Sequence, residues 1–111
     1  MNIDTIRTTV AKGQARHPEL AGRMERAALL LVLRRVEKEA DGSWRVESER
    51  ERGHFYRVTP DGCECPDVQR APGGYCKHRL AVALRVVCQR RERWQRFMTD
   101  RKVLAYVTVF Q

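Results

Sequence analysis

The sequence of 111 residues lacks a hydrophobic run long enough to cross a bilayer. Its longest apolar run, Ala27–Leu33, covers seven residues, whereas a spanning helix needs about 20. The N-terminal stretch MNIDTIRTTVAKGQARHPEL has no apolar core behind basic residues, as a secretory signal would have. The sequence therefore predicts no membrane association and an intracellular protein, which would be cytoplasmic or, in a eukaryote, nuclear.

Internal repeats, low-complexity tracts and linkers are also missing from the sequence. The chain is therefore expected to form one domain over residues 1–111. A domain of this size buries a modest core, and a metal or a disulfide often adds to its stability. Cysteine is scarce, with four residues, three of which fall within residues 62–84. In a reducing compartment such a cluster favours metal binding or redox chemistry over structural disulfides.

Acidic residues are few in the C-terminal half of the chain. Residues 44–111 hold fourteen Lys or Arg against eight Asp or Glu, and the whole chain has a net charge of +8. The segment Lys77–Lys102 holds nine basic residues against only Glu92 and Asp100. This distribution is typical of a protein that binds a polyanion. A solvated helix face is the alternative, since arginine outnumbers lysine eighteen to four throughout the chain.

The apolar residues of the N-terminal third recur at helical spacing, and those further on alternate as in strands, which predicts an α+β fold. Residues 1–35 are expected to form a helical segment. Its first helix runs from Asp4 to Ala11 and ends near Gly13. Its second helix follows Pro18, which suits the first turn of a helix. The continuous apolar run in this second helix predicts that its second half is buried on most sides.

The middle and the end of the chain show turn signals and a change of period. Asp41-Gly42 is a hairpin signal, and Gly53 and Pro60-Asp61-Gly62 mark two further turns of a small antiparallel meander. Residues 36–40 fit either a strand or a continued helix, and we favour the strand. A helix is predicted from Arg79 to Met98, with His78 in its first turn. The β-branched and aromatic run Val103–Phe110 predicts a terminal strand.

Two short-spaced pairs, Cys63-x-Cys65 and Cys76-x-His78, stand ten residues apart. Three thiolates and one imidazole make a complete tetrahedral set for zinc and leave no position for a substrate water. Glycine and proline residues flank both pairs and allow the backbone to curl so that the four side chains can converge. The spacing therefore predicts a closed, structural metal site.

Other uses of these cysteines fit the spacing less well. A Cys63–Cys65 disulfide would close a very small ring, and a redox site would show Cys-x-x-Cys, which is absent. The His-x-Glu and Pro-Cys-x-x-Cys motifs of a zinc deaminase are also absent. An iron–sulfur centre of the CDGSH type has a Cys-x-x-x-His pair, whereas this chain has Cys-x-His. Cys88 is interpreted as a small core residue.

The stretch Cys-x-Cys-Pro-Asp, a spacer and then Gly-Tyr-Cys-Lys-His-x-Leu-Ala-Val resembles a SWIM-type zinc finger. The preceding SWRVESERERGHFYRVTPDG resembles the β-hairpin of that family, so the resemblance covers roughly residues 36–88. It implies a ββα module that holds one structural Zn²⁺, with Cys63, Cys65, Cys76 and His78 as its ligands. Members of the family are associated with DNA binding and protein interaction, often beside transposases, helicases or recombination factors.

We therefore expect a zinc module that is not an enzyme and that binds nucleic acid through the basic helix after the metal site. DNA is the expected partner, RNA is an alternative, and no small-molecule substrate is expected. Residues 89–111 would form the end of this helix and the terminal strand. The predicted phosphate contacts surround the metal loop and follow the helix: Arg70, Lys77, Arg79, Arg85, Arg90, Arg91, Arg93 and Arg96.

A different class of function is a protein-interaction adaptor in a recombination, transposition or repair assembly. The terminal strand would then pair with a partner or with a second copy of the chain, and the basic helix would dock an acidic surface. Aromatic residues offer a further alternative, because bases stack on exposed rings. The candidates for stacking are Trp44, Tyr56, Tyr75 and Trp94, of which Trp44 and Tyr56 are expected in the hairpin core.

Overall fold

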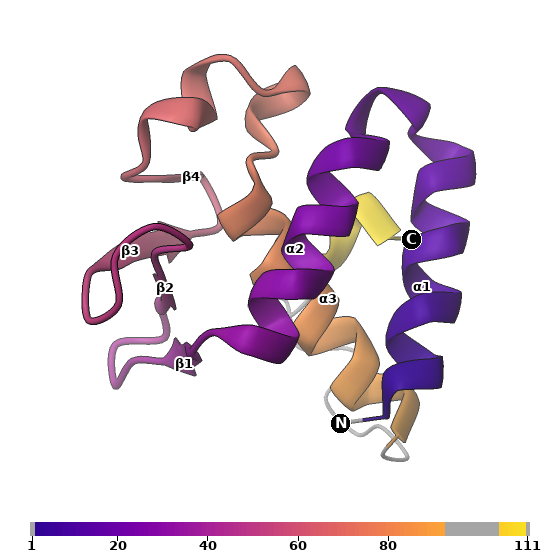
Figure 1. The fold of residues 1–111 in the computed structure, drawn as a ribbon, viewed down its shortest axis with the longest axis horizontal. Helices are drawn as coiled ribbons and strands as arrows, with labels where there is room; N and C mark the ends of the chain where they lie inside the picture. Colours follow the sequence, from indigo (N-terminus) through magenta and orange to yellow (C-terminus); the bar gives the residue numbers. More distant parts are fainter. Residues whose placement is uncertain (1, 93–104, 111) are drawn as a thin grey trace.

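The computed structural model describes residues 2–92 and 105–110, which form helices and one antiparallel sheet (Figure 1). The predicted α+β class is confirmed. The long helices are α1 (Ile3–Arg16), α2 (Ala21–Leu33) and α3 (Lys77–Glu92). The strands are β1 (Val36–Lys38), β2 (Trp44–Glu47), β3 (Phe55–Thr59) and β4 (Gly62–Cys63). The short 3-10 helices are η1 (Pro18–Leu20), η2 (Pro66–Gln69), η3 (Pro72–Gly74) and η5 (Thr108–Phe110).

Helix α3 is the central element of the fold. It contacts α1, α2 and all four strands, and Figure 1 shows it crossing behind α2. Leu80, Leu84 and Cys88 of α3 are fully buried, as are Met24 and Leu30 of α2. The interpretation of Cys88 as a core residue is confirmed. Because α3 starts at the metal loop, the core and the metal site share one rigid element.

Helix α1 is longer than the sequence predicts, and Gly13 lies inside it rather than at its end. A Cβ at Gly13 would lie 2.8 Å from Cε1 of Phe110 and 2.9 Å from Sδ of Met24. The glycine therefore permits close packing between α1, α2 and the C-terminal segment. The chain then turns at His17, and Pro18 begins the 3-10 turn that leads into α2, in agreement with the predicted helix start.

The second half of α2 is not buried on most sides, contrary to the prediction. The side chains of Leu29, Val32 and Leu33 are 57%, 54% and 61% exposed. Only one face of the helix, which includes Met24, Ala27 and Leu30, reaches the core. A continuous apolar run does not indicate which face of the helix lacks a neighbour. No described element covers the face that carries Leu29, Val32 and Leu33.

The sheet has the order β1-β2-β3-β4 with antiparallel neighbours throughout. Residues 36–38 are a strand, which decides between the two interpretations of residues 36–40. Val36, Val46 and Tyr56 stand opposite one another across three strands and face α3, and Val36 and Val46 are buried. Glycine residues with positive φ, at Gly42 and Gly53, occupy the two predicted turns that flank β2.

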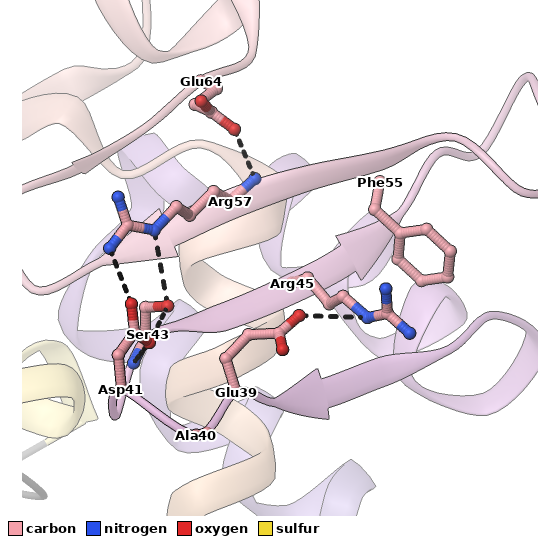
Figure 2. A pocket seen from close by; sticks show the side chains of 8 residues that line it. All are labelled: Glu39, Ala40, Asp41, Ser43, Arg45, Phe55, Arg57 and Glu64. Atoms are coloured by element: carbon pink, nitrogen blue, oxygen red, sulfur yellow. Dashed lines mark hydrogen bonds and ion pairs between the residues drawn. The ribbon is translucent and has the colours of Figure 1, made fainter.

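The outer face of the sheet carries paired charges around a hollow of about 490 Å³ (Figure 2). Arg45 lies 3.2 Å from the Glu39 carboxylate, and Arg57 lies 3.1 Å from that of Asp41. The Arg45 guanidinium also lies 4.3 Å from the centroid of the Phe55 ring. Because carboxylates neutralise these cations, the outer face has little attraction for an anion.

The predicted terminal strand is wrong for the part of Val103–Phe110 that the structure describes. Residues 105–107 are helical and Thr108–Phe110 forms a 3-10 turn. Val107 and Val109 are 0% and 4% exposed, and this segment packs on α1 and α3. Strand propensities span only about 1 kcal/mol, whereas burial of one large apolar side chain contributes about 1.5–3 kcal/mol. Burial therefore outweighs the β-branched composition here.

Helix α3 begins at Lys77, so His78 lies in its first turn as predicted, and the helix is described as far as Glu92. The rest of the helix predicted to reach Met98 lies outside the described residues, as does Trp94. Among the described helices, none is both long enough and apolar enough to cross a membrane.

Candidate metal centre

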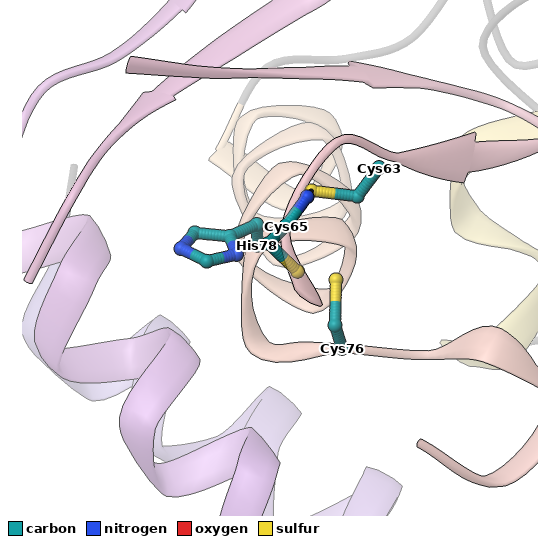
Figure 3. A group of neighbouring side chains, drawn as sticks. All are labelled: Cys63, Cys65, Cys76 and His78. Atoms are coloured by element: carbon teal, nitrogen blue, oxygen red, sulfur yellow. Dashed lines mark hydrogen bonds between the residues drawn. The ribbon is translucent and has the colours of Figure 1, made fainter. Parts of the chain in front are cut away.

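The four predicted ligand residues meet at one point beside the start of α3 (Figure 3). The ligand atoms of Cys63, Cys65, Cys76 and His78 all lie within 4.8 Å of one another. In a tetrahedral site with Zn–S bonds of about 2.3 Å and Zn–N bonds of about 2.0 Å, ligand atoms lie somewhat under 4 Å apart. The cluster therefore has nearly the size that a zinc ion needs, and a small inward movement would close it.

The backbone brings these residues together through two departures from regular structure. Strand β4 ends at Cys63, and Pro66 starts the 3-10 helix η2 directly after Cys65. Gly73 and Gly74 then adopt φ values of +62° and +76°, which favour glycine, and return the chain towards Cys76. The predicted curl of the backbone around both pairs is thus present.

The imidazole of His78 is buried without hydrogen-bond partners. The residue is 3% exposed, and neither ring nitrogen has a partner among the described residues. Buried polar atoms are nearly always satisfied, because each unsatisfied atom costs about 1–3 kcal/mol. A metal ion bound by one nitrogen explains half of this deficit, and the three thiols beside the ring supply the other ligands. The residues present fit zinc.

The three thiols also affect one another's ionisation. A hydrogen bond from Cys63 lowers the pKa of Cys76 to about 4. The same hydrogen bond, together with burial, raises the pKa of Cys63, and burial raises the pKa of Cys65. The cluster therefore holds one negative charge readily, and the second and third thiolates need a cation to form. A divalent ion supplies that charge.

Side chains from outside the loop hold it in position. Nε and Nη2 of Arg23, on α2, both donate to the carboxylate of Asp67 at 3.0 Å. This bidentate pair lowers the pKa of Asp67 and joins the helical hairpin to the metal loop. Arg79 donates to the carbonyl oxygens of Gly74 at 2.9 Å and Pro60 at 2.8 Å. These contacts hold the metal loop in position on two sides.

A second link joins α3 to the turn between β2 and β3. Lys77 Nζ donates to the Glu49 carboxylate at 3.2 Å, which lowers the pKa of Glu49. Arg26 of α2 approaches the same carboxylate at 3.4 Å. Sequence reasoning missed Arg23, Arg26 and Glu49, because no local pattern relates residues that lie 23 to 44 positions from their partners.

The eight predicted phosphate contacts do not form one described stripe. Arg79 and Arg85 are used within the fold, since Arg85 donates to the Val36 carbonyl oxygen at 2.6 Å and lies near the Trp44 ring. Arg70 and Lys77 lie together beside the metal loop. Arg90 is half-buried near the end of α3. The remaining three contacts lie outside the described side chains: Arg91, Arg93 and Arg96.

Of the four aromatic candidates, Trp44 belongs to the core. It is 6% exposed and makes an edge contact with Tyr106. Tyr75 lies under the Arg79 guanidinium, and Tyr56 contacts the rings of His54 and His78. The rings of Tyr56 and Tyr75 are half-buried, and both belong to the surroundings of the metal centre.

Comparison with known families agrees with this geometry. The family model of the SWIM zinc finger matches residues 46–86, which include β2, β3, β4, the metal loop and the first part of α3. No curated protein and no solved structure matches the chain. The cluster of Cys63, Cys65, Cys76 and His78 is therefore the site of one structural Zn²⁺.

Proposed function

We propose that the chain, whose residues 46–86 match the SWIM zinc finger, is a non-catalytic zinc module that binds nucleic acid, with DNA as the expected ligand. Four protein donors fill the tetrahedral sphere of zinc, so the ion has no position for a substrate or an activated water. The metal then serves the fold, because binding energy at such a site is folding energy. This supports a binding role rather than catalysis.

The observation that carries the proposal is the excess of positive charge in the half of the chain that holds the metal loop. Residues 44–111 contain fourteen basic and eight acidic residues. Arg79 and Arg85 are used within the fold. Lys77 is paired with Glu49. We therefore assign phosphate contact to Arg70 beside the loop and to the end of the basic helix, namely Arg90, Arg91, Arg93 and Arg96.

The first test is the salt dependence of DNA binding. Neutralisation of about four to six phosphates gives a slope of log affinity against log salt of roughly −4 to −5 on duplex DNA. The triple substitution Arg90→Gln, Arg91→Gln and Arg93→Gln should make that slope less steep by about 0.9 for each phosphate that is no longer neutralised. A wild-type protein whose affinity is insensitive to salt would contradict the proposal. An unchanged slope in the variant would place the phosphate-binding residues elsewhere.

A second candidate function is a protein-interaction adaptor in a recombination, transposition or repair assembly, or a homodimer. The helical conformation of residues 105–110 removes the expected strand pairing as support. The exposed row Leu29, Val32 and Leu33 on α2 favours this candidate instead, because such rows commonly mark contact surfaces. Gel filtration with and without DNA distinguishes the two functions. A protein complex that survives high salt favours the adaptor, and a DNA complex that dissolves favours nucleic-acid binding.

A further inference from the structure

A cleft of about 580 Å³ lies between α2 and the metal loop. Its walls carry five cationic side chains from separate parts of the chain: Arg23, Arg26, Arg50, Arg70 and Lys77. Tyr56, Cys65 and His78 also line it, so the cleft extends to the metal centre. Two of the five cations, Arg23 and Arg26, come from α2, which lies outside the matched zinc-finger residues.

The cleft keeps a positive charge after its carboxylates are counted. Five cations against Glu49 and Asp67 leave +3, and a zinc ion with three thiolates adds −1, which leaves +2. The hollow on the outer sheet face, by contrast, holds two arginines against three carboxylates, a balance of −1. An anion is therefore drawn to the cleft and not to the sheet.

The cations in the cleft divide into two groups. Arg23 and Lys77 are held by Asp67 and Glu49 and so maintain the shape of the walls. Arg26 is 61% exposed and has only a contact of 3.4 Å with Glu49. Among the described residues, no ion pair engages the exposed guanidinium groups of Arg50 and Arg70. Three arginines are thus available at the rim for a ligand.

His78 supplies a second, independent indication of a ligand. When one ring nitrogen binds zinc, the other carries a hydrogen, and this buried donor has no acceptor among the described residues. Figure 3 shows the ring with one edge towards the sulfur atoms and the other edge directed away from them. Because His78 lines the cleft, an oxygen atom bound in the cleft would be a suitable acceptor. Ligand histidines almost always have such a partner for their second nitrogen.

We propose that this cleft binds the phosphates of a single DNA strand, with Arg26, Arg50 and Arg70 as contacts. The inference rests on the proposed nucleic-acid binding and specifies the site and the form of the ligand. The volume of the cleft lies in the range of sites that hold one small molecule. The cleft can therefore enclose one nucleotide of a single strand but not a duplex. A positive groove with an aromatic ring, here Tyr56, is the usual arrangement for single-strand binding.

The test compares two triple variants of equal charge. Arg26→Gln, Arg50→Gln and Arg70→Gln remove the proposed phosphate-binding cations, and Arg7→Gln, Lys12→Gln and Arg16→Gln remove three exposed charges from α1. None of these three residues lines the cleft, and Figure 1 shows α1 on the far side of α2 from the metal loop. Fluorescence anisotropy with a labelled 20-nucleotide single strand and its duplex gives the affinities. Zinc content and melting temperature verify that both variants fold.

We expect the single strand to bind more tightly than the duplex. In the cleft variant, the removal of three cations should make the salt slope less steep by about 2 and reduce affinity about 100-fold at 0.1 M salt. The affinity of the α1 variant should fall by less than about threefold. Equal losses of affinity in the two variants, or a preference for the duplex, would show that the cleft is not the single-strand site. Either result would leave the proposed nucleic-acid binding intact. A wild-type protein that binds neither the single strand nor the duplex would overturn both proposals.

Discussion

Gly13 shows how one missing side chain sets the distance between elements. It lies in α1 where the Phe110 ring and the Met24 thioether approach the helix axis, and a Cβ there would meet both at under 3 Å. Gly22, on α2, has no atom within 4 Å of its hypothetical Cβ. Both glycines lie in helices, Gly13 well inside α1 and Gly22 in the first turn of α2, so they can be compared.

We predict that Gly13→Ala destabilises the protein and that Gly22→Ala stabilises it. Overpacking costs about 1–3 kcal/mol, which exceeds the gain of about 1 kcal/mol from replacing glycine in a helix. At Gly22 only the gain applies. Urea unfolding followed by circular dichroism measures both changes. A stabilised Gly13→Ala variant would mean that the C-terminal segment does not pack on α1 as described.

The sequence allowed the metal ligands to be predicted but not the role of Gly13. Cys63, Cys65, Cys76 and His78 combine a chemistry and a spacing that few other sites share, so the residues alone identify the set. A glycine, by contrast, has no side chain to indicate its neighbours. Its role depends on Phe110, which lies 97 positions away in the chain, and no local pattern records that contact.

At the scale of elements, α3 joins the sheet to the helical hairpin, and Arg85 takes part in this junction. Its Nη1 donates to the carbonyl oxygen of Val36 on the edge strand β1, and its guanidinium lies 5.8 Å from the centroid of the Trp44 ring. The side chain thus supports β1 and β2 from the α3 side of the sheet. This is a structural use of a residue that the charge pattern assigns to phosphate binding.

Arg85→Gln should therefore reduce stability and leave DNA binding unchanged. A hydrogen bond to a charged group contributes about 1.5–3 kcal/mol, so we expect a destabilisation of about that size in urea unfolding. The slope of DNA affinity against salt should equal that of the wild type. Arg85→Lys serves as the control, since it keeps the charge but not the planar donor group. A variant with wild-type stability and a less steep slope would make Arg85 a phosphate contact.

The strands were easier to predict than the environment of the helices. Turn residues with required backbone conformations, such as Gly42 and Gly53, mark the hairpins locally. The exposed side of α2 and the conformation of residues 105–110 depend on which other elements are nearby. An apolar helix run and a β-branched segment carry no such information, and both predictions were wrong for that reason.

At the scale of the whole molecule, the metal centre and the core form a single unit. Cys76 precedes α3 and His78 lies in its first turn, while the next turns of the same helix fill the core between α1, α2 and the sheet. The ion pair of Arg23 with Asp67 joins α2 to the metal loop, and that of Lys77 with Glu49 joins α3 to the turn between β2 and β3. The cleft between α2 and the loop arises only from this assembly, so the sequence could not reveal it.

Removal of zinc should therefore unfold the whole molecule and not the loop alone. Structural zinc contributes on the order of 10 kcal/mol, which is comparable to the total stability of about 5–15 kcal/mol for a domain. Cys76→Ser should lose zinc and show no cooperative thermal transition by circular dichroism. Cys88→Ala is the control, because this buried thiol lies outside the cluster, and the variant should keep one zinc per chain and a single transition. If Cys76→Ser retained the α1–α2 hairpin with a transition of its own, the two halves would fold independently, and the cleft would depend on their docking rather than on one shared core.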